Sequence, residues 1–396
     1  MVDYLRTPFS RSRPKQPERD VFHDIPADQL LAKIVKELVG RNKFNPTQID
    51  EIITGCANQV KENFLYGGRH SVFLAELPET VAAMGIDRQC GSSMSSIHIG
   101  AMEIMTGNSE IVLGCGMEHM TRIPRGTDLT LRHKELGDKE KYPDHAKYDL
   151  NTGFSMLQTA QRLWEENPDI TRKDMDKFSL ESHDKAARAR DKGFFDDENL
   201  AIEGKLPDGK KKTIRYDQAI RTGSDMEIMS KLPVVSKGIN KEPQITAGNS
   251  SPLNAGASAC ILMSESLAEE LGIKPLAKIV SMGWAGVNPG IMGSGPVPAS
   301  EKALSNARLK VEDIDFWEIN EAFAIVPLYA KKMLNIDPEI ININGGAIAI
   351  GHPLGATGAR LVGTLARILQ KQGGNYGLAT ACVGGGQGVA TIIEKV

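Results

Sequence analysis

The sequence predicts an α/β fold made of two related halves, with a charged segment inserted between them. Helix and strand patterns alternate at both ends of the 396-residue chain, as they do in layered α/β proteins. A helix that leads into a strand ending in a glycine turn occurs in the first third and again in the last third. Residues 121–243 carry crowded charges and lack long apolar strands. If the halves are a duplication that packs face to face, one site is expected at their joint.

The first half opens with a predicted helix in residues 27–41, whose apolar stripe is opened by Asp28 and stopped at Gly40. A strand, a second strand, a helix and a third strand are expected to follow over residues 51–56, 84–90, 91–105 and 110–116. We interpret the apolar run 111–114 as a sheet edge that a second copy of the chain would cover.

The inserted segment is predicted to be helical and exposed, with helices over 152–166 and 172–192 and a turn at Pro207-Asp208-Gly209 between short polar strands. The last third returns to a helix from about Gly358 and a strand that ends near Cys382. The predicted parts are a first core half (1–119 with 249–271), an inserted loop domain (120–248) and a second core half (272–396).

Composition excludes several classes of function. Lys and Arg number 47 against 50 Asp and Glu, so a net charge of −3 provides no field for nucleic acid. Five cysteines form no C-x-x-C pair and have no His at ligand spacing, which predicts neither disulfides nor a metal site. No run of 18 apolar residues predicts a membrane span. We therefore expect a soluble, cytoplasmic protein in a reducing compartment.

Cys90 is the first candidate for chemistry. It lies where a predicted strand ends and a helix begins, and the small residues Gly91, Ser92 and Ser93 follow it. Unpaired N–H groups at a helix N-terminus favour the thiolate and lower the pKa of a cysteine. This placement predicts a nucleophile, and a buried structural cysteine is the alternative interpretation.

His352 lies in the segment Gly351-His-Pro-Leu-Gly-Ala-Thr-Gly358, where proline and glycines predict a rigid, closely packed turn. A neutral imidazole presented there could accept the proton of Cys90. A second thiol, Cys382, precedes glycines whose N–H groups can form an anion nest. Asn320 is a polar residue in an apolar stretch, so it is either a structural anchor or a site residue.

Taken together, the motifs resemble those of the thiolase family. They are Cys90-Gly-Ser-Ser-Met94, Asn320-Glu-Ala-Phe-Ala324, Gly351-His-Pro-x-Gly-x-Thr-Gly358 and Cys382-x-Gly-Gly-Gly-x-Gly388, in the family's order and over almost the whole chain. The resemblance implies the thiolase fold, a duplicated five-layer α-β-α-β-α core with an inserted loop domain. Cys-Gly-Ser-Ser-Met and Glu118-His119-Met120 look closer to the 3-ketoacyl-CoA thiolases of bacterial fatty-acid β-oxidation than to the biosynthetic branch.

The resemblance implies an acyltransferase that works by a ping-pong mechanism through an acyl-Cys90 intermediate. His352 would take the thiol proton and, with Asn320 through a water, hold one oxyanion. Cys382 would be the second acid and base, and the N–H groups of Cys90 and Gly384 would form the second oxyanion hole. CoA would be a substrate, with no permanently bound cofactor.

The same resemblance places Ser251, Met156 and Phe323 along a tunnel for CoA and Arg221 near one of its phosphates. Ser155 stands where several relatives have a histidine, which puts a direct polar contact with a bound thioester in doubt. The expected partners are acyl-CoA, CoA and copies of the chain in a homodimer or homotetramer, possibly with other fatty-acid oxidation enzymes. Two alternatives stay open, a condensing enzyme of the same fold and a non-catalytic lipid-binding or scaffold subunit.

Overall fold

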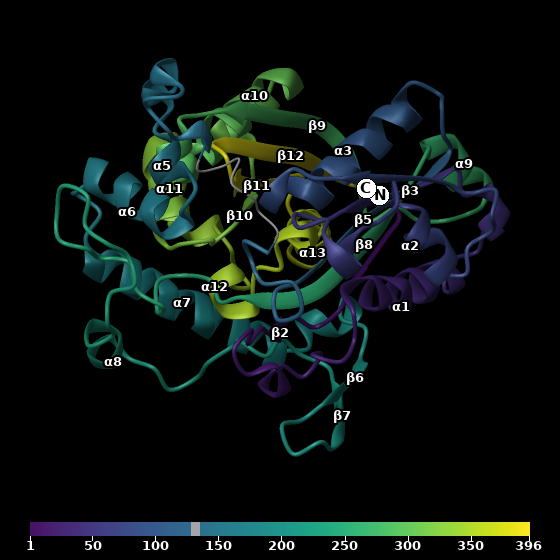
Figure 1. Cartoon of the computed structure of the whole chain (residues 1–396). Coiled ribbons are helices and arrows are strands. Elements are labelled where there is room, and N and C mark those ends of the chain that lie inside the picture. The colour runs from purple at the N-terminus through teal and green to yellow at the C-terminus, as the bar shows by residue number, and fades with distance from the viewer. Residues whose placement is uncertain (128–134) are drawn as a thin grey trace.

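The computed structural model describes residues 1–127 and 135–396 and contains two mixed β-sheets (Figure 1). The first sheet has the order β1 (Asp3–Arg6), β8 (Asn254–Met263), β5 (Ile111–His119), β3 (Glu51–Gly55) and β4 (Ala82–Ile86), with β2 (Ser10–Arg11) also paired to β8. The second has the order β10 (Phe316–Ile319), β11 (Tyr376–Val383), β12 (Gln387–Lys395) and β9 (Ala277–Gly286).

The two sheets share one topology. In the first, β3 is parallel to β5, which is antiparallel to β8, which is antiparallel to β1. In the second, β10, β11, β12 and β9 repeat these directions in the same order. Each half therefore runs strand, helix, strand, helix, strand, strand, and the predicted duplication is confirmed.

Helices complete five layers. On the outer face of the first sheet lie α1 (Ala27–Gly40), α2 (Arg69–Leu74) and α9 (Glu265–Glu270). The second sheet is covered on its outer face by α10 (Pro296–Ala307) and α11 (Ile325–Leu334). Between the sheets lie α3 (Ser92–Met105) and α13 (Thr357–Gln372), whose apolar side chains contact both of them. His98 of α3 also reaches Thr391 of β12, at 2.8 Å between Nε2 and Oγ1, so the central helices join the halves.

The strand expected at a sheet edge is central, so that expectation is wrong. β5 lies between β3 and β8, and all of its residues are buried. An unbroken apolar run is typical of a strand covered on both faces, and it does not reveal which strands pair with it. The edges of this sheet are β4 on one side and β1, with β2, on the other.

Three predicted boundaries also shift. Asp28 lies inside α1, which begins at Ala27 after Pro26 and includes Gly40. The strand expected over 84–90 covers Ala82–Ile86, because the chain has already turned at Gln89. The helix expected over 152–166 is divided between α5 (Leu150–Gly153) and α6 (Met156–Glu166).

The segment before β8 also contains α7 (Arg172–Asp191), α8 (Met226–Ser230) and a hairpin of β6 (Ile202–Lys205) and β7 (Lys211–Ile214) around the predicted turn. In the last third, the short helix α12 covers Ala347–Ile350. Residues 128–134 of the predicted insertion lie outside the described residues. The domain limits stay a prediction. None of the helices in the described ranges is long and apolar enough to cross a bilayer.

Short 3₁₀ helices join these elements, at Pro17–Arg19, Pro46–Gln48, Lys61–Asn63, Gln89–Gly91, Pro143–Tyr148, Phe194–Asp197, Pro289–Ser294, Val311–Asp313, Pro338–Ile340 and Leu354–Ala356.

Candidate active site

Cys90 lies in the 3₁₀ turn that connects β4 to α3, as the sequence predicts. The turn needs a backbone φ of 44° at Gln89, in the left-handed region that non-glycine residues seldom adopt. Ser92 holds it, since its hydroxyl donates to the Gln89 carbonyl at 2.7 Å and accepts the Arg88 N–H at 3.0 Å. The thiol is presented at the end of α3 with its residue only 5 % exposed.

The pKa of Cys90 is raised, not lowered as the helix N-terminus predicts. Burial is the largest cause, and it outweighs the positive charge of Arg125 and the N–H of Gly384 that approaches the sulfur. The thiol therefore keeps its proton at neutral pH, and it needs a base to become a nucleophile.

His352 has the tautomer that such a base requires. Its Nδ1 lies 2.6 Å from the hydroxyl of Thr357, and that hydroxyl donates its one proton to the Pro353 carbonyl at 2.8 Å. Thr357 can only accept from the ring, so the ring proton is assigned to Nδ1 and Nε2 carries a lone pair. Asn320 Nδ2 donates to Nε2 at 3.3 Å. Burial lowers the pKa of His352 to about 3, so the imidazole is neutral at neutral pH.

The turn that carries His352 is held by two side chains that the sequence analysis did not identify as site residues. Asn254 Oδ1 accepts the His352 N–H at 2.8 Å. Glu118, fully buried, accepts the N–H groups of Gly355 at 3.1 Å and Ala57 at 3.0 Å. A Cβ at Gly355 would lie 2.2 Å from the Met117 carbonyl oxygen, so only glycine allows the turn to approach β5 so closely.

Cys382 lies near the end of β11 and is completely buried. Burial, with a further contribution from Cys90, raises its pKa well above the usual range, so it is a neutral thiol in electrostatic contact with Cys90. It belongs to the same buried apolar cluster as Phe323. Gly385 and Gly386 follow at φ of 86° and 83°, and this turn directs the Gly384 N–H toward Cys90.

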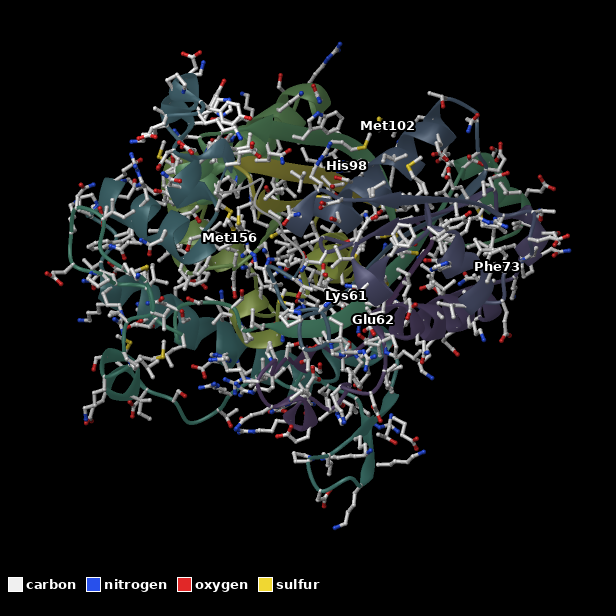
Figure 2. The ribbon with its side chains drawn as sticks, in the orientation of Figure 1. Lys61, Glu62, Phe73, His98, Met102 and Met156 are labelled. Carbon is white, nitrogen blue, oxygen red and sulfur yellow. The ribbon has the colours of Figure 1, made fainter. Side chains whose placement is uncertain are left out.

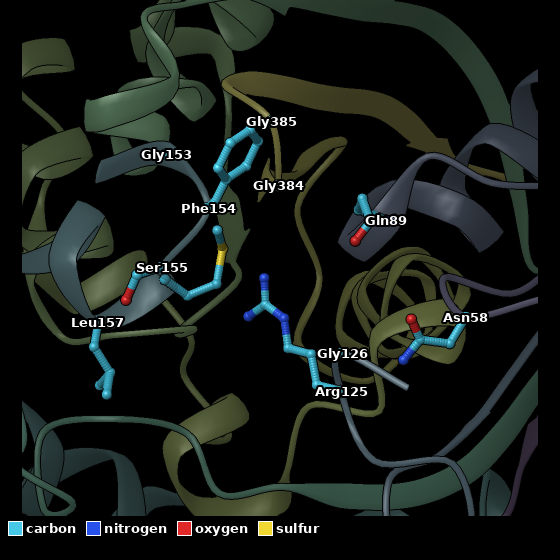
Figure 3. Close-up of a pocket in the computed structure, with 11 residues that line it drawn as sticks. Asn58, Gln89, Arg125, Gly126, Gly153, Phe154, Ser155, Leu157, Gly384 and Gly385 are labelled. Carbon is cyan, nitrogen blue, oxygen red and sulfur yellow. The ribbon is translucent and has the colours of Figure 1, made fainter. Parts of the chain in front are cut away.

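Three cavities meet around these residues. The thiol cavity, of about 230 Å³, is lined by both Cys90 and His352, together with Arg125, Met156, Ser251 and Phe323. The donor pocket, of about 530 Å³, shares Arg125, Met156 and Leu157 with it and is also lined by Asn58, Gln89 and Gly384 (Figure 3). The arginine pocket, of about 90 Å³, is lined by Arg11, His183 and Arg221 and shares Ser250 and Pro252 with the thiol cavity.

The residues expected along CoA are thus divided between two cavities. Ser251, Met156 and Phe323 line the thiol cavity, whereas Arg221 is exposed beside the arginine pocket. Met156 begins α6 and is labelled in the left half of Figure 2. Arg11, which the sequence analysis missed, faces the same pocket as Arg221. Arg11 ends the two-residue strand β2 and Arg221 lies in a loop, and segments this short have no periodicity that would reveal such residues.

Comparison with protein families decides which family the chain resembles. Residues 1–266 match the model described as thiolase, N-terminal domain, and residues 273–395 match thiolase, C-terminal domain. This chain belongs to the thiolase family. The thiolase is similar to proteins named 3-ketoacyl-CoA thiolase from Marinobacter nauticus, at 41 % identity, and Alcanivorax borkumensis, at 42 %, over 100 % of the chain and 98 % of each relative.

Solved structures agree with the sequence relatives. A crystal structure of human mitochondrial 3-ketoacyl-CoA thiolase superposes on this thiolase with a TM-score of 0.87 at 35 % identity, covering 100 % of the chain and 98 % of the human one. The same human enzyme in complex with CoA gives a TM-score of 0.86 and covers 97 % of that chain. The expected fold is therefore confirmed.

Proposed function

We propose that this thiolase transfers an acyl group between a 3-ketoacyl-CoA and CoA, either as thiolysis to acetyl-CoA and a shortened acyl-CoA or as the reverse Claisen condensation. One observation carries the proposal: the neutral imidazole of His352 has its ring proton on Nδ1, so Nε2 can accept a proton, and it lines the same cavity as the protonated thiol of Cys90. The names of the relatives support a 3-ketoacyl-CoA as the substrate.

In the first half of the reaction, the Cys90 proton moves to His352 Nε2 and the sulfur attacks the keto carbon. The bond between C2 and C3 of the substrate then breaks, and the acyl group stays on Cys90. The departing enolate takes the proton of Cys382 and leaves as acetyl-CoA. Burial keeps that proton on sulfur until a stronger base forms beside it.

In the second half, CoA attacks the thioester of acyl-Cys90. The proton of the CoA thiol goes to the Cys382 thiolate, and the new thioester leaves as the shortened acyl-CoA. The freed Cys90 sulfur recovers its proton from His352. Each thiol thus ends the cycle as it began: His352 carries the proton of Cys90, and Cys382 exchanges a proton with the substrates, in both half-reactions.

Two groups of donors would stabilise the oxyanions. Protonated His352 can donate from Nε2 to the first one. Asn320 Oδ1 is buried without a hydrogen-bond partner among the described residues, which fits the water that the resemblance implies there. The N–H groups of Cys90 and Gly384 already approach the Cys90 sulfur, where the carbonyl oxygen of the acyl-enzyme would lie.

CoA would run from the thiol cavity to the arginine pocket. Ser251, Met156 and Phe323 would contact its pantetheine arm, and Arg221 with Arg11 would face its phosphates. Burial and the neighbouring positive charges of Arg221, Arg13 and Arg19 lower the pKa of Arg11 to about 10, which shows how crowded with cations this region is. Such a cluster is stabilised by an anion. The proposal needs no permanently bound cofactor.

We also propose that the thiolase is a homo-oligomer, a dimer at least. The unpaired edge of β4 and exposed apolar side chains on neighbouring helices support it, because an uncovered edge and apolar patch favour association. A tetramer, an association with other fatty-acid oxidation enzymes and a cytoplasmic location stay predictions.

Covalent labelling tests the proposed function. Incubation with a 3-ketoacyl-CoA, followed by intact-mass and peptide analysis, is expected to show an acyl adduct on Cys90. The Cys90→Ala variant is expected to lose both the adduct and thiolysis. The matched control is Cys260→Ala, which removes a buried thiol of β8 away from the site. An adduct on Cys382 alone would show that the nucleophile is misassigned.

A further inference from the structure

We propose that the acyl group of the preferred substrate ends in a carboxylate, which Arg125 and Asn58 hold in the donor pocket. The inference rests on the proposed function and names the substrate class more narrowly, as a short 3-ketoacyl-CoA with a negatively charged far end.

Arg125 is the central observation. Its side chain extends into the middle of the donor pocket (Figure 3) and also lines the thiol cavity. The residue is exposed, and its side chain reaches solvent through the pocket. Its guanidinium has no hydrogen bond or ion pair with any described side chain. An arginine that is exposed to a concave pocket and has no hydrogen-bond or ion-pair partner among the described residues can form charge-assisted hydrogen bonds to an anion that binds there.

Asn58 is the second, independent observation. It is only 7 % exposed, and its Nδ2 has no hydrogen-bond partner among the described residues. An unpaired buried donor carries a desolvation cost that an acceptor on a ligand would remove. It lines the same pocket as Arg125, and no described lining residue of that pocket is acidic. The pocket therefore offers a charge and a donor to an anion, and Glu118, the carboxylate whose charge acts on Arg125, lies outside the lining of this pocket.

The positions of the cavities assign this anion to the acyl group and not to CoA. The arginine pocket, which suits the CoA phosphates, meets the thiol cavity at Ser250 and Pro252. The donor pocket meets the thiol cavity elsewhere, at Arg125, Met156 and Leu157, and Gly384 lines the donor pocket. An acyl group on Cys90 with its carbonyl oxygen at the Gly384 N–H would extend into the donor pocket.

The lining also indicates the form of the acyl group. Met156 and Leu157 offer apolar contacts for a few methylene groups. The chain must be short, because Arg125 lines the same cavity as Cys90. A plain alkyl tail of that length would leave both Arg125 and Asn58 Nδ2 without an acceptor, and a site built to bind a polar group discriminates against ligands that lack it.

The test compares thiolysis of 3-oxohexanoyl-CoA with that of 3-oxohexanedioyl-CoA, which differ only by the terminal carboxylate. The wild-type enzyme is expected to favour the second substrate in kcat/KM by about 10- to 100-fold, the range of a charge-assisted hydrogen bond. Arg125→Met is expected to reduce this ratio to about 1, and Arg125→Lys to restore part of it. The matched control Arg221→Met is expected to change both substrates by the same factor and leave the ratio intact.

The outcomes are distinguishable. Equal kcat/KM for the two substrates in the wild-type enzyme, or a preference for the alkyl chain, would overturn the inference while the proposed function stands. If Arg125→Met lowered kcat/KM by the same factor for both substrates, the inference would also be overturned, because Arg125 would then bind a part that both substrates share, such as a CoA phosphate. If neither substrate is cleaved and no acyl-Cys90 forms, the proposed function fails along with it.

Discussion

The two thiols of the site have different surroundings, and these suit different tasks. Cys90 faces the Gly384 N–H and the charge of Arg125, both of which favour its thiolate. For Cys382, by contrast, burial and the nearby Cys90 both favour the protonated form. The first can become an anion once a base acts on it, whereas the second holds a proton until the reaction demands it.

Cys382→Ser separates these tasks. Turnover is expected to fall by about 10²–10⁴, the range of a lost proton transfer, because a serine hydroxyl is a weaker acid than a thiol. Acetyl-CoA should still acylate Cys90, since that step depends on His352. The measurement is hydrogen–deuterium exchange into the methyl group of acetyl-CoA, which should be lost while the acetyl-enzyme is still trapped. Exchange at the wild-type rate would assign the second base to another residue.

Glu118 predicts a specific pH dependence of stability. Burial raises its pKa to about 7 from 4.5, so the folded state binds the proton more tightly than the unfolded state. This contribution to stability is complete below about pH 4.5 and is lost as the pH rises through about 7. Glu118→Gln removes it, so the free energy of unfolding of the variant, relative to wild type, is expected to rise between about pH 5 and 8 by up to about 3 kcal/mol.

Denaturant unfolding of wild type and Glu118→Gln at about pH 5 and at about pH 8 measures the difference in their free energies of unfolding. The carboxyl of Glu318, whose pKa burial also raises to about 7, is present in both proteins and cancels. Exposed Glu79→Gln is the matched control and should show no such change. If Glu118→Gln and wild type differed by the same free energy of unfolding at both pH values, the raised pKa assigned to Glu118 would be wrong.

At this scale the sequence reveals only part of the site. Cys90 and His352 stand in glycine-rich motifs whose local geometry is encoded beside them, and the prediction that they meet follows from the resemblance and from the expected joint of the two halves. Arg125 and Asn58 occur in loops without periodicity, and they reach the site only because separate parts of the first half fold together. Their role depends on having no hydrogen-bond or ion-pair partner for the Arg125 guanidinium and Asn58 Nδ2 in the part of the chain that the structure describes, which no local pattern records.

At the scale of elements, each half delivers a reactive group on the turn before a central helix. Cys90 precedes α3, and His352 precedes α13. The predicted helix and strand order of both halves follows from their periodicity. The pairing partners of β5 cannot be predicted from its periodicity, because its apolar pattern would be the same whether β8 or solvent lay along its second edge.

Gly355→Ala tests the close contact of the His352 turn with β5. The new methyl group would lie 2.2 Å from the Met117 carbonyl oxygen, and the backbone must move. We expect a loss of about 1–3 kcal/mol in the free energy of unfolding and a fall in kcat, because His352 shifts with its turn. Gly40→Ala is the matched control, since a Cβ there meets nothing within 4 Å and alanine suits the helix. Equal stability of Gly355→Ala and wild type would exclude this packing role.

At the scale of the whole molecule, one surface remains to be covered. Phe73 of α2 and Met105 of α3 are 57 % and 59 % exposed, and both helices pack beside the edge strand β4. Sedimentation equilibrium is expected to give at least twice the chain mass of 43.0 kDa. Met105→Asp should shift the equilibrium toward monomer, whereas Met333→Asp, on the opposite outer layer in α11, should not. A wild-type monomer would rule out the oligomer.

The position of β8 has a consequence for synthesis on the ribosome. This strand follows the long segment that contains α5–α8, yet it completes the first sheet between β1 and β5. Until Asn254–Met263 has left the exit tunnel, a nascent chain exposes the unpaired sides of both neighbours. Such edges invite aggregation. The first half therefore cannot mature ahead of the insertion, and a translational pause before this strand would lengthen the period in which the nascent chain depends on chaperones.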